Sequence, residues 1–229
     1  MIEAVLFDWS NTLVEFTWDD DLLVAGHRAA LEAAGSDEDA EEFTARYREL
    51  VLAGATPDDP YPALLRQLLG ESTDEQIDAF IDAEHEAWAP AHQPLASAQA
   101  LLESLRGQGV KTGLVANSWP DPARVLRRDV ERYGFAPLLD VLVFSEEVGA
   151  RKPQPEIFEH ALRKLGVDAD AAMFVGDRLE TDVQGAANVG MTTVQALWFR
   201  ADDNTSGIEP DFLAFTPMDV LNAVRRLAR

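Results

Sequence analysis

The sequence of 229 residues contains no cysteine and few basic side chains. Without cysteine, disulfides, thiolate metal sites and thiol catalysis are all excluded. Lysine and arginine together number 19, against 41 aspartates and glutamates, which gives a formal net charge of −22. This balance argues against nucleic acid and anionic membranes as partners, because both require basic patches. The acidity itself is typical of a solvated surface.

The sequence also lacks a long hydrophobic run. No stretch approaches the roughly 18 apolar residues that cross a bilayer. The first strand carries Glu3 and Asp8, a pattern unlike a signal peptide. We therefore expect a cytoplasmic protein that does not enter a membrane. The sequence leaves open whether it is a monomer or a homodimer.

The order of predicted elements indicates an α/β protein. Helical patterns alone fill residues 19 to 89, and a regular alternation of helices and strands follows. The expected strands are Ala4–Phe7, Thr112–Ala116, Val141–Phe144, Ala172–Val175 and Thr193–Trp198, with Phe212–Phe215 as a further short one. We predict a three-layer, Rossmann-like parallel sheet of about five strands with an inserted all-helical domain.

Turn and capping residues set the limits of the inserted helices. Ser36 is expected to be the N-cap of the second helix, and Thr73 with Gln76 forms a capping box for the fourth. The predicted division is a core domain of residues 1–13 and 95–229, and a helical domain of residues 14–94. The four histidines show no spacing typical of a metal site and are expected at the surface; they are His27, His85, His92 and His160.

Asp8 ends the first apolar run, Ala4–Phe7. In an open parallel sheet, the carboxyl ends of the strands are where ligands bind. A carboxylate at that place can act as a nucleophile or hold a metal. Taken alone, the pattern fits equally well an aspartate that caps the next turn.

Two later segments resemble the haloacid dehalogenase superfamily when they are taken together with Asp8. Lys152-Pro153 precedes a helical stretch, in a chain that has only three lysines. Gly176-Asp177 ends another apolar run, and Asp182 follows five residues later. The order of these three parts is far more specific than any one of them, and the resemblance covers essentially the whole chain. In such proteins, a helical insertion after the first strand is a cap that closes over the site.

The resemblance implies a magnesium-dependent reaction at the carboxyl edge of the sheet. Asp8 matches the aspartate that attacks a phosphoryl group, and the implied Mg²⁺ ligands are Asp8, the main-chain carbonyl of Ser10 and Asp177. Asp182 would orient metal-bound water or serve as a ligand. The alternative is that its carboxylate only complements the dipole at a helix N-terminus. Lys152 would neutralise charge between the nucleophile and the phosphoryl oxygens.

The chain departs from the family pattern at two places. Ser10 stands where phosphatases carry a second aspartate, which protonates the leaving group and activates water. Ala116 stands where a serine or threonine binds the phosphoryl oxygen, so Asn117 and Ser118 are the candidate replacements, unless they form a plain turn. Thr12 is a further candidate for substrate binding. Asn11 replaces a usual glycine, and asparagine tolerates the left-handed conformation.

Hydrolysis of a small phosphorylated metabolite is the leading interpretation, because the pair Asp177 and Asp182 belongs to the metal-using members. Two alternatives stay open. A 2-haloacid dehalogenase would use Asp8 on carbon without a metal and also lacks the second aspartate. A degenerate protein would bind Mg²⁺ and a phosphorylated ligand without turnover, since both Ser10 and Ala116 are substitutions.

Overall fold

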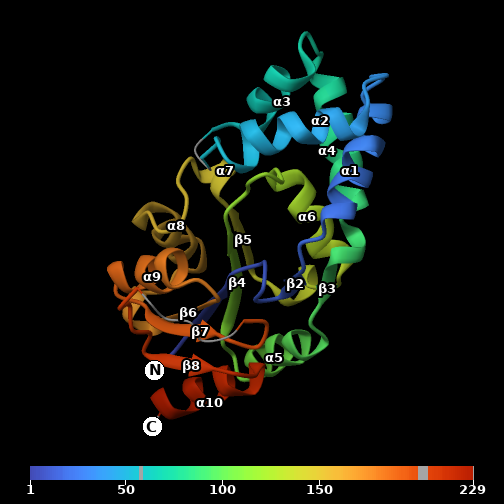
Figure 1. Ribbon diagram of the computed structural model, residues 1–229. Coiled ribbons are helices and arrows are strands. Elements are labelled where there is room, and N and C mark those ends of the chain that lie inside the picture. The colour runs from blue at the N-terminus through green and yellow to red at the C-terminus, as the bar shows by residue number, and fades with distance from the viewer. Residues whose placement is uncertain (57–58, 201–205, 229) are drawn as a thin grey trace. The chain divides into compact units, whose positions relative to one another are not determined.

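The computed structural model describes residues 1–56, 59–200 and 206–228 (Figure 1). The chain forms two compact units. The first comprises Met1–Phe16, Gln93–Ser118 and Leu126–Arg229, and the second comprises Thr17–His92 and Trp119–Val125. The segment Trp119–Val125 thus belongs with the helical unit, although it follows the second long strand of the sheet. No helix within the described ranges is long and apolar enough to span a bilayer.

The first unit is built on one parallel sheet. Its order is β5-β4-β1-β6-β7-β8, and every neighbouring pair is parallel. The sheet has six strands rather than about five, because the short segment near residue 212 pairs with β7. The strands are β1 (Ala4–Phe7), β4 (Lys111–Ala116), β5 (Val141–Phe144), β6 (Ala172–Gly176), β7 (Thr192–Ala196) and β8 (Phe212–Ala214). The predicted α/β class is confirmed.

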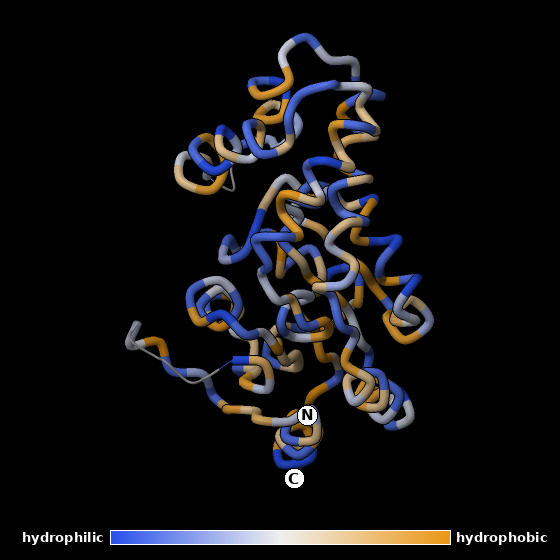
Figure 2. The backbone as a smooth tube through the Cα atoms, turned by 45° about the vertical axis from the view of Figure 1, so that its right-hand side comes forward, coloured by the Kyte–Doolittle hydropathy of each residue, from blue (hydrophilic) through white to orange (hydrophobic). Residues whose placement is uncertain are grey.

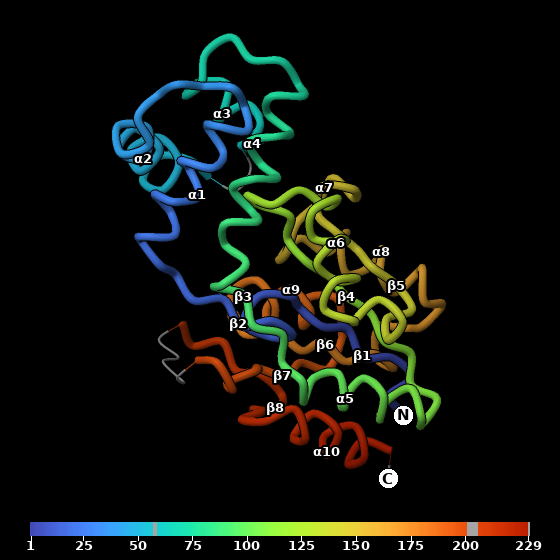
Figure 3. Tube along the Cα trace, turned by 90° about the vertical axis from the view of Figure 1, so that its right-hand side faces the viewer, coloured from blue at the N-terminus to red at the C-terminus, as the bar shows by residue number. Residues whose placement is uncertain are grey.

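Helices cover both faces of this sheet (Figures 1 and 3). On one face, α8 packs against β4 and β5, and its Phe158 ring meets Phe174 of β6 edge-on at 5.1 Å. On the other face, α5 and α10 lie side by side. The helices of this unit are α5 (Ala96–Gly107), α7 (Ser145–Val148), α8 (Pro155–Leu165), α9 (Gln184–Asn188) and α10 (Pro217–Leu227), with most of α6 (Ala123–Arg132).

The central strands are apolar on both faces. All four residues of β1 and all five of β6 are buried. Along the helices, in contrast, hydrophobic and hydrophilic residues are interspersed, as Figure 2 shows. Strands buried on both faces are typical of parallel sheets that are covered by helices. This burial holds the ends of β1 and β6 in fixed register, with Phe7 beside Val175.

The described residues of the second unit form α1 (Asp20–Ala33), α2 (Ala40–Tyr47), α3 (Tyr61–Leu69), α4 (Asp74–Ala87) and the first residues of α6. The capping box of Thr73 and Gln76 at the start of α4 is confirmed. The prediction for Ser36 is wrong: the N-cap of α2 is Asp39, whose carboxylate accepts hydrogen bonds from the N–H groups of Glu41 and Glu42. Ser36 only accepts a local bond from Glu38 N, at 3.3 Å. A short two-stranded ladder, β2 (Val14–Phe16) with β3 (His92–Pro94), was not expected.

A buried polar cluster lies inside this helical unit. His27 is fully buried and His85 nearly so, which corrects the expectation that the histidines are exposed. The Thr44 hydroxyl donates to the carbonyl of Ala40, so His27 Nδ1 donates to Thr44 Oγ1, at 2.7 Å. His27 Nε2 then faces Glu84 Oε1 at 3.3 Å, and the other Glu84 oxygen accepts from Tyr61. The helices therefore meet around paired polar groups as well as apolar ones.

Candidate active site

Asp8 follows the last residue of β1, between the ends of two neighbouring strands. Phe7 pairs with Leu114 of β4 on one side and with Val175 of β6 on the other. The N–H of Asp8 donates to the carbonyl of Val175 at 2.9 Å, which continues the ladder by one residue. The carboxylate is therefore held at the carboxyl edge of the sheet, where the strand order changes direction along the chain.

Lys152 reaches Asp8 from the segment that precedes α8. Its ammonium lies 2.5 Å from Asp8 Oδ1 and 2.8 Å from Asp182 Oδ1, and its side chain is only 3% exposed. The Asn117 amide holds the lysine backbone from both sides, since Lys152 N donates to Asn117 Oδ1 and Asn117 Nδ2 donates to the Lys152 carbonyl. Asn117 thus positions Lys152, and the substrate contact predicted for it stays a prediction.

Asp177 and Asp182 come from the end of β6 and the turn that follows. Asp182 lies in the helical turn η5 (Leu179–Val183), and its Oδ2 accepts from the N–H of Arg178 at 3.0 Å. A Cβ at Gly176 would lie 2.5 Å from the Asp182 carboxylate, so only glycine leaves room for that side chain. The Gly-Asp pair of the sequence is explained by this close approach.

Burial and mutual repulsion change the protonation of this group. Burial raises the pKa of Asp8, and the nearby charge of Asp182 adds to the rise, although Lys152 opposes it. Burial, together with Asp8 and Asp182, raises the pKa of Asp177 to about 7. Burial alone would lower the pKa of Lys152, but attraction from Asp182 and Asp8 raises it above its ordinary value. Three carboxylates so close together favour a further cation.

The three carboxylates suit a divalent metal ion. One oxygen from each of Asp8, Asp177 and Asp182 lies within 4.8 Å of the others. Both Asp177 oxygens are buried and have no hydrogen-bond partner within the described part of the chain. Hard oxygen ligands are those that Mg²⁺ prefers, and it binds through few protein carboxylates while keeping several waters. The residues present therefore fit such an ion.

The remaining predicted residues lie in the two loops beside Asp8. Thr12 is buried and Ser10 is exposed. The hydroxyls of Thr12 and Ser118 are buried without a hydrogen-bond partner among the described residues, while Ser118 N donates to Ser145 Oγ. Unpaired buried hydroxyls are costly, so both are available to a ligand. Asn11 has φ of 57°, the left-handed conformation expected where asparagine replaces glycine.

Arg200 is the residue that the sequence motifs did not indicate. Its Nε lies 2.9 Å from Asp177 Oδ2. It lies in the loop after β7, which contains no motif or periodic pattern, so the sequence does not indicate a role for it. The contact became visible only when β6 and β7 were placed side by side.

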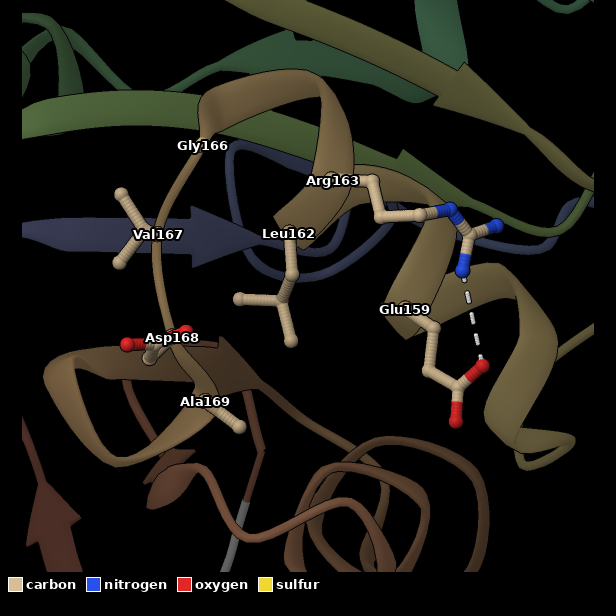
Figure 4. Close-up of a pocket in the computed structure, with 7 residues that line it drawn as sticks. All are labelled: Glu159, Leu162, Arg163, Gly166, Val167, Asp168 and Ala169. Carbon is tan, nitrogen blue, oxygen red and sulfur yellow. Dashed lines mark ion pairs between the residues drawn. The ribbon is translucent and has the colours of Figure 1, made fainter.

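A separate hollow of about 350 Å³ lies at the opposite, amino edge of the sheet, before β6 (Figure 4). The pocket is lined by residues from the end of α8 to Ala169, with Glu159 and Arg163 forming an exposed ion pair at 3.6 Å. No predicted site residue lines it. The chemistry therefore belongs to the carboxyl edge.

Comparisons with known proteins agree with this geometry. Residues 2–190 match the family described as haloacid dehalogenase-like hydrolase. A glyceraldehyde 3-phosphate phosphatase from Methanopyrus kandleri is 32% identical, with 100% of both chains covered. Two solved structures share the fold. A HAD phosphatase from Thermococcus onnurineus has a TM-score of 0.68 and 24% identity, with 97% of this chain and 98% of that chain covered. A 2-haloacid dehalogenase from Pseudomonas syringae has a TM-score of 0.65 and 25% identity, with 99% of this chain and 100% of that chain covered.

Proposed function

Because this chain belongs to the haloacid dehalogenase-like hydrolases, we propose that it is a Mg²⁺-dependent phosphatase of small phosphorylated metabolites. The observation that carries the proposal is the convergence of Asp8, Asp177 and Asp182 around one point, where neither Asp177 oxygen has a hydrogen-bond partner in the described part of the chain. A metal-free dehalogenase has no use for two further buried carboxylates beside its nucleophile. The M. kandleri relative makes triose phosphates the first substrates to try.

Asp8 is the proposed nucleophile. Its carboxylate oxygen attacks phosphorus, the bond from phosphorus to the ester oxygen breaks, and the leaving oxygen takes the electron pair. Water then releases phosphate from the aspartyl-phosphate. Asp8, Asp177 and the Ser10 carbonyl would hold Mg²⁺, with Asp182 orienting its waters or serving as a ligand, and the ion would neutralise the phosphoryl charge. Lys152 orients Asp8 and favours its ionised form, while Thr12 and Ser118 offer hydroxyls to the substrate.

The helical segment 14–94 is proposed to be the cap of this enzyme. The run Asp19-Asp20-Asp21 starts α1: Asp19 is its N-cap and accepts from the N–H groups of Asp21 and Leu22. With Ser10 unable to donate a proton near neutral pH, the leaving oxygen is proposed to take its proton from water. Substrates with good leaving groups should therefore be turned over fastest.

The test is hydrolysis of p-nitrophenyl phosphate and acetyl phosphate by the purified chain. Turnover should require Mg²⁺, stop in EDTA, and disappear in Asp8→Asn, a variant of nearly equal size. Release of halide from 2-chloropropionate in EDTA would identify a dehalogenase and overturn the proposal. Stabilisation by phosphate with Mg²⁺, but without turnover above Asp8→Asn, would identify a binding protein.

A further inference from the structure

Arg200 lies in the segment that follows β7, and a hydrogen bond anchors this segment at the site. Trp198, two residues before it, donates from Nε1 to the main-chain carbonyl of Thr12 at 3.0 Å. This bond ties the end of β7 to the loop that follows Asp8. Arg200, which contacts Asp177, is thus two residues from a tryptophan that is anchored on the loop after Asp8.

The ion pair between Arg200 and Asp177 differs from the one at Lys152. Lys152 is 3% exposed and lies between two carboxylates, whereas the Arg200 side chain is 47% exposed and faces one. Although Arg200 Nε lies 2.9 Å from Asp177 Oδ2, neither Asp177 oxygen has a hydrogen-bond partner among residues 1–56, 59–200 and 206–228. The contact is therefore a close charge pair without hydrogen-bond geometry. Such a pair, open to solvent on one side, is easily exchanged for a better one.

We propose that Arg200 is a phosphoryl-binding residue with two successive partners. It neutralises Asp177 until a divalent ion binds there, and it then pairs with the phosphoryl oxygens of the substrate. This inference rests on the proposed phosphatase function. The attraction between Arg200 and Asp177 Oδ2 weakens once that carboxylate coordinates a divalent cation, because the guanidinium and the ion then repel each other. Because Trp198 anchors its segment, the displaced guanidinium stays beside the metal, where a phosphoryl group would bind.

Charge and geometry both favour the second partner. Three carboxylates and two cations give the site a net charge of −1, which a divalent ion turns into +1, suited to a phosphate dianion. The planar guanidinium binds phosphate through two parallel hydrogen bonds. The strand-end hydroxyl that would otherwise bind a phosphoryl oxygen is missing at Ala116. Arg200 therefore supplies hydrogen-bond donors for the phosphoryl group in a chain that lacks the strand-end hydroxyl.

The test compares Arg200→Gln with Arg178→Gln by isothermal titration calorimetry. Arg178 is exposed and contributes only a longer-range field at Asp177, so it controls for the loss of one positive charge. Titrated with Mg²⁺ alone, Arg200→Gln should bind about three- to tenfold more tightly than the wild type, and Arg178→Gln less than twofold. Equal gains in the two variants, or no gain in Arg200→Gln, would overturn the competition with the metal.

The second arm titrates inorganic phosphate into Mg²⁺-saturated protein. Arg200→Gln should lose about tenfold or more in phosphate affinity, Arg200→Lys should lose less, and Arg178→Gln should stay within about threefold of the wild type. An unchanged phosphate affinity in Arg200→Gln would contradict the substrate contact. Both titrations measure binding and need no turnover. An absence of turnover would therefore count against the phosphatase proposal, and the two titrations would still test the role of Arg200.

Discussion

Ser10 determines whether a proton donor stands beside the nucleophile. It is exposed at the start of the loop after Asp8, where a longer acidic side chain has room. We expect Ser10→Asp to raise kcat for p-nitrophenyl phosphate with Mg²⁺ at least tenfold, because the new carboxylate would activate the water that attacks the aspartyl-phosphate, and a positioned acid or base is typically worth about 10²–10⁴-fold. Steady-state kinetics measure the gain. Ser10→Asn, of the same size but unable to donate a carboxyl proton, is the matched control and should show none.

Asn11 holds the same loop in a conformation that few residues adopt. Its φ is 57°, and its Oδ1 accepts a hydrogen bond from Phe16 N at 3.0 Å. Asn11→Ala should lower the free energy of unfolding by about 2 kcal/mol, from left-handed strain and the lost bond. Asn11→Gly should lose only about 1 kcal/mol, because glycine carries no strain there. Urea unfolding measures both, and equal losses would show that the conformation contributes nothing.

Among the single residues of the site, the sequence could predict those that directly follow an apolar strand. Asp8 and Asp177 follow strands directly, and the structure brings them together with Lys152 and Asp182. Arg200 could not be predicted, since its loop has no periodic pattern. The sequence also does not predict the hydrogen bonds between Asn117 and the Lys152 backbone, because they join two loops that meet only in the folded chain.

Helix α2 shows how a capping residue can be misjudged from sequence. Ser36 and Asp39 are both good N-cap types, three residues apart, and the structure uses Asp39. Asp39→Ala should therefore lower the free energy of unfolding by about 1 kcal/mol, since two backbone N–H groups lose their acceptor. Ser36→Ala is the control and should cost only a few tenths. Thermal and urea unfolding of the whole chain measure the difference, and a reversed ranking would contradict this assignment.

Asp140 links the starts of β4 and β5 and makes that link depend on pH. Its carboxylate accepts from Thr112 N at 2.8 Å and from Arg106 at 2.6 Å. Burial raises its pKa, but the bonds from Thr112 and Arg106 outweigh burial, so the pKa lies below its ordinary value. The stabilisation is therefore present above the unfolded pKa, about 4, and is lost as the pH falls through the lowered folded value.

The variant Asp140→Asn isolates this effect. The difference in unfolding free energy between wild type and variant should be largest above about pH 5 and should shrink below about pH 4. Urea unfolding at a series of pH values measures it. A difference that stays constant across the series would mean that the ionised carboxylate is not the stabilising form.

Elements were predictable where burial left a plain pattern. The central strands are apolar on both faces, so their runs in the sequence coincide with β1, β4, β5 and β6 to within one residue. The ladder of β2 and β3 was missed because each strand has three residues and includes polar ones, such as Glu15 and Gln93. Strands this short are defined by pairing, which the sequence does not display.

The whole molecule carries a formal net charge of −22, which its fold must tolerate. Self-repulsion among surface carboxylates destabilises the compact state, and dissolved salt screens it over about 10 Å at 0.1 M. We expect the melting temperature to rise by several degrees between 0.05 and 0.5 M NaCl at pH 7.5, since about 1 kcal/mol shifts it by 2–4 °C for a chain of this size. Differential scanning calorimetry measures the rise.

A less acidic variant separates screening from general effects of salt on protein surfaces. Changing six exposed glutamates to glutamine removes six negative charges while it keeps side-chain size; the positions are Glu3, Glu32, Glu71, Glu103, Glu131 and Glu209. This variant should melt at a higher temperature than the wild type in 0.05 M NaCl, and its gain on adding salt should be smaller. Both effects follow from repulsion, because fewer like charges leave less to screen. Equal salt gains in the two proteins would assign the rise to ion exclusion from the surface instead.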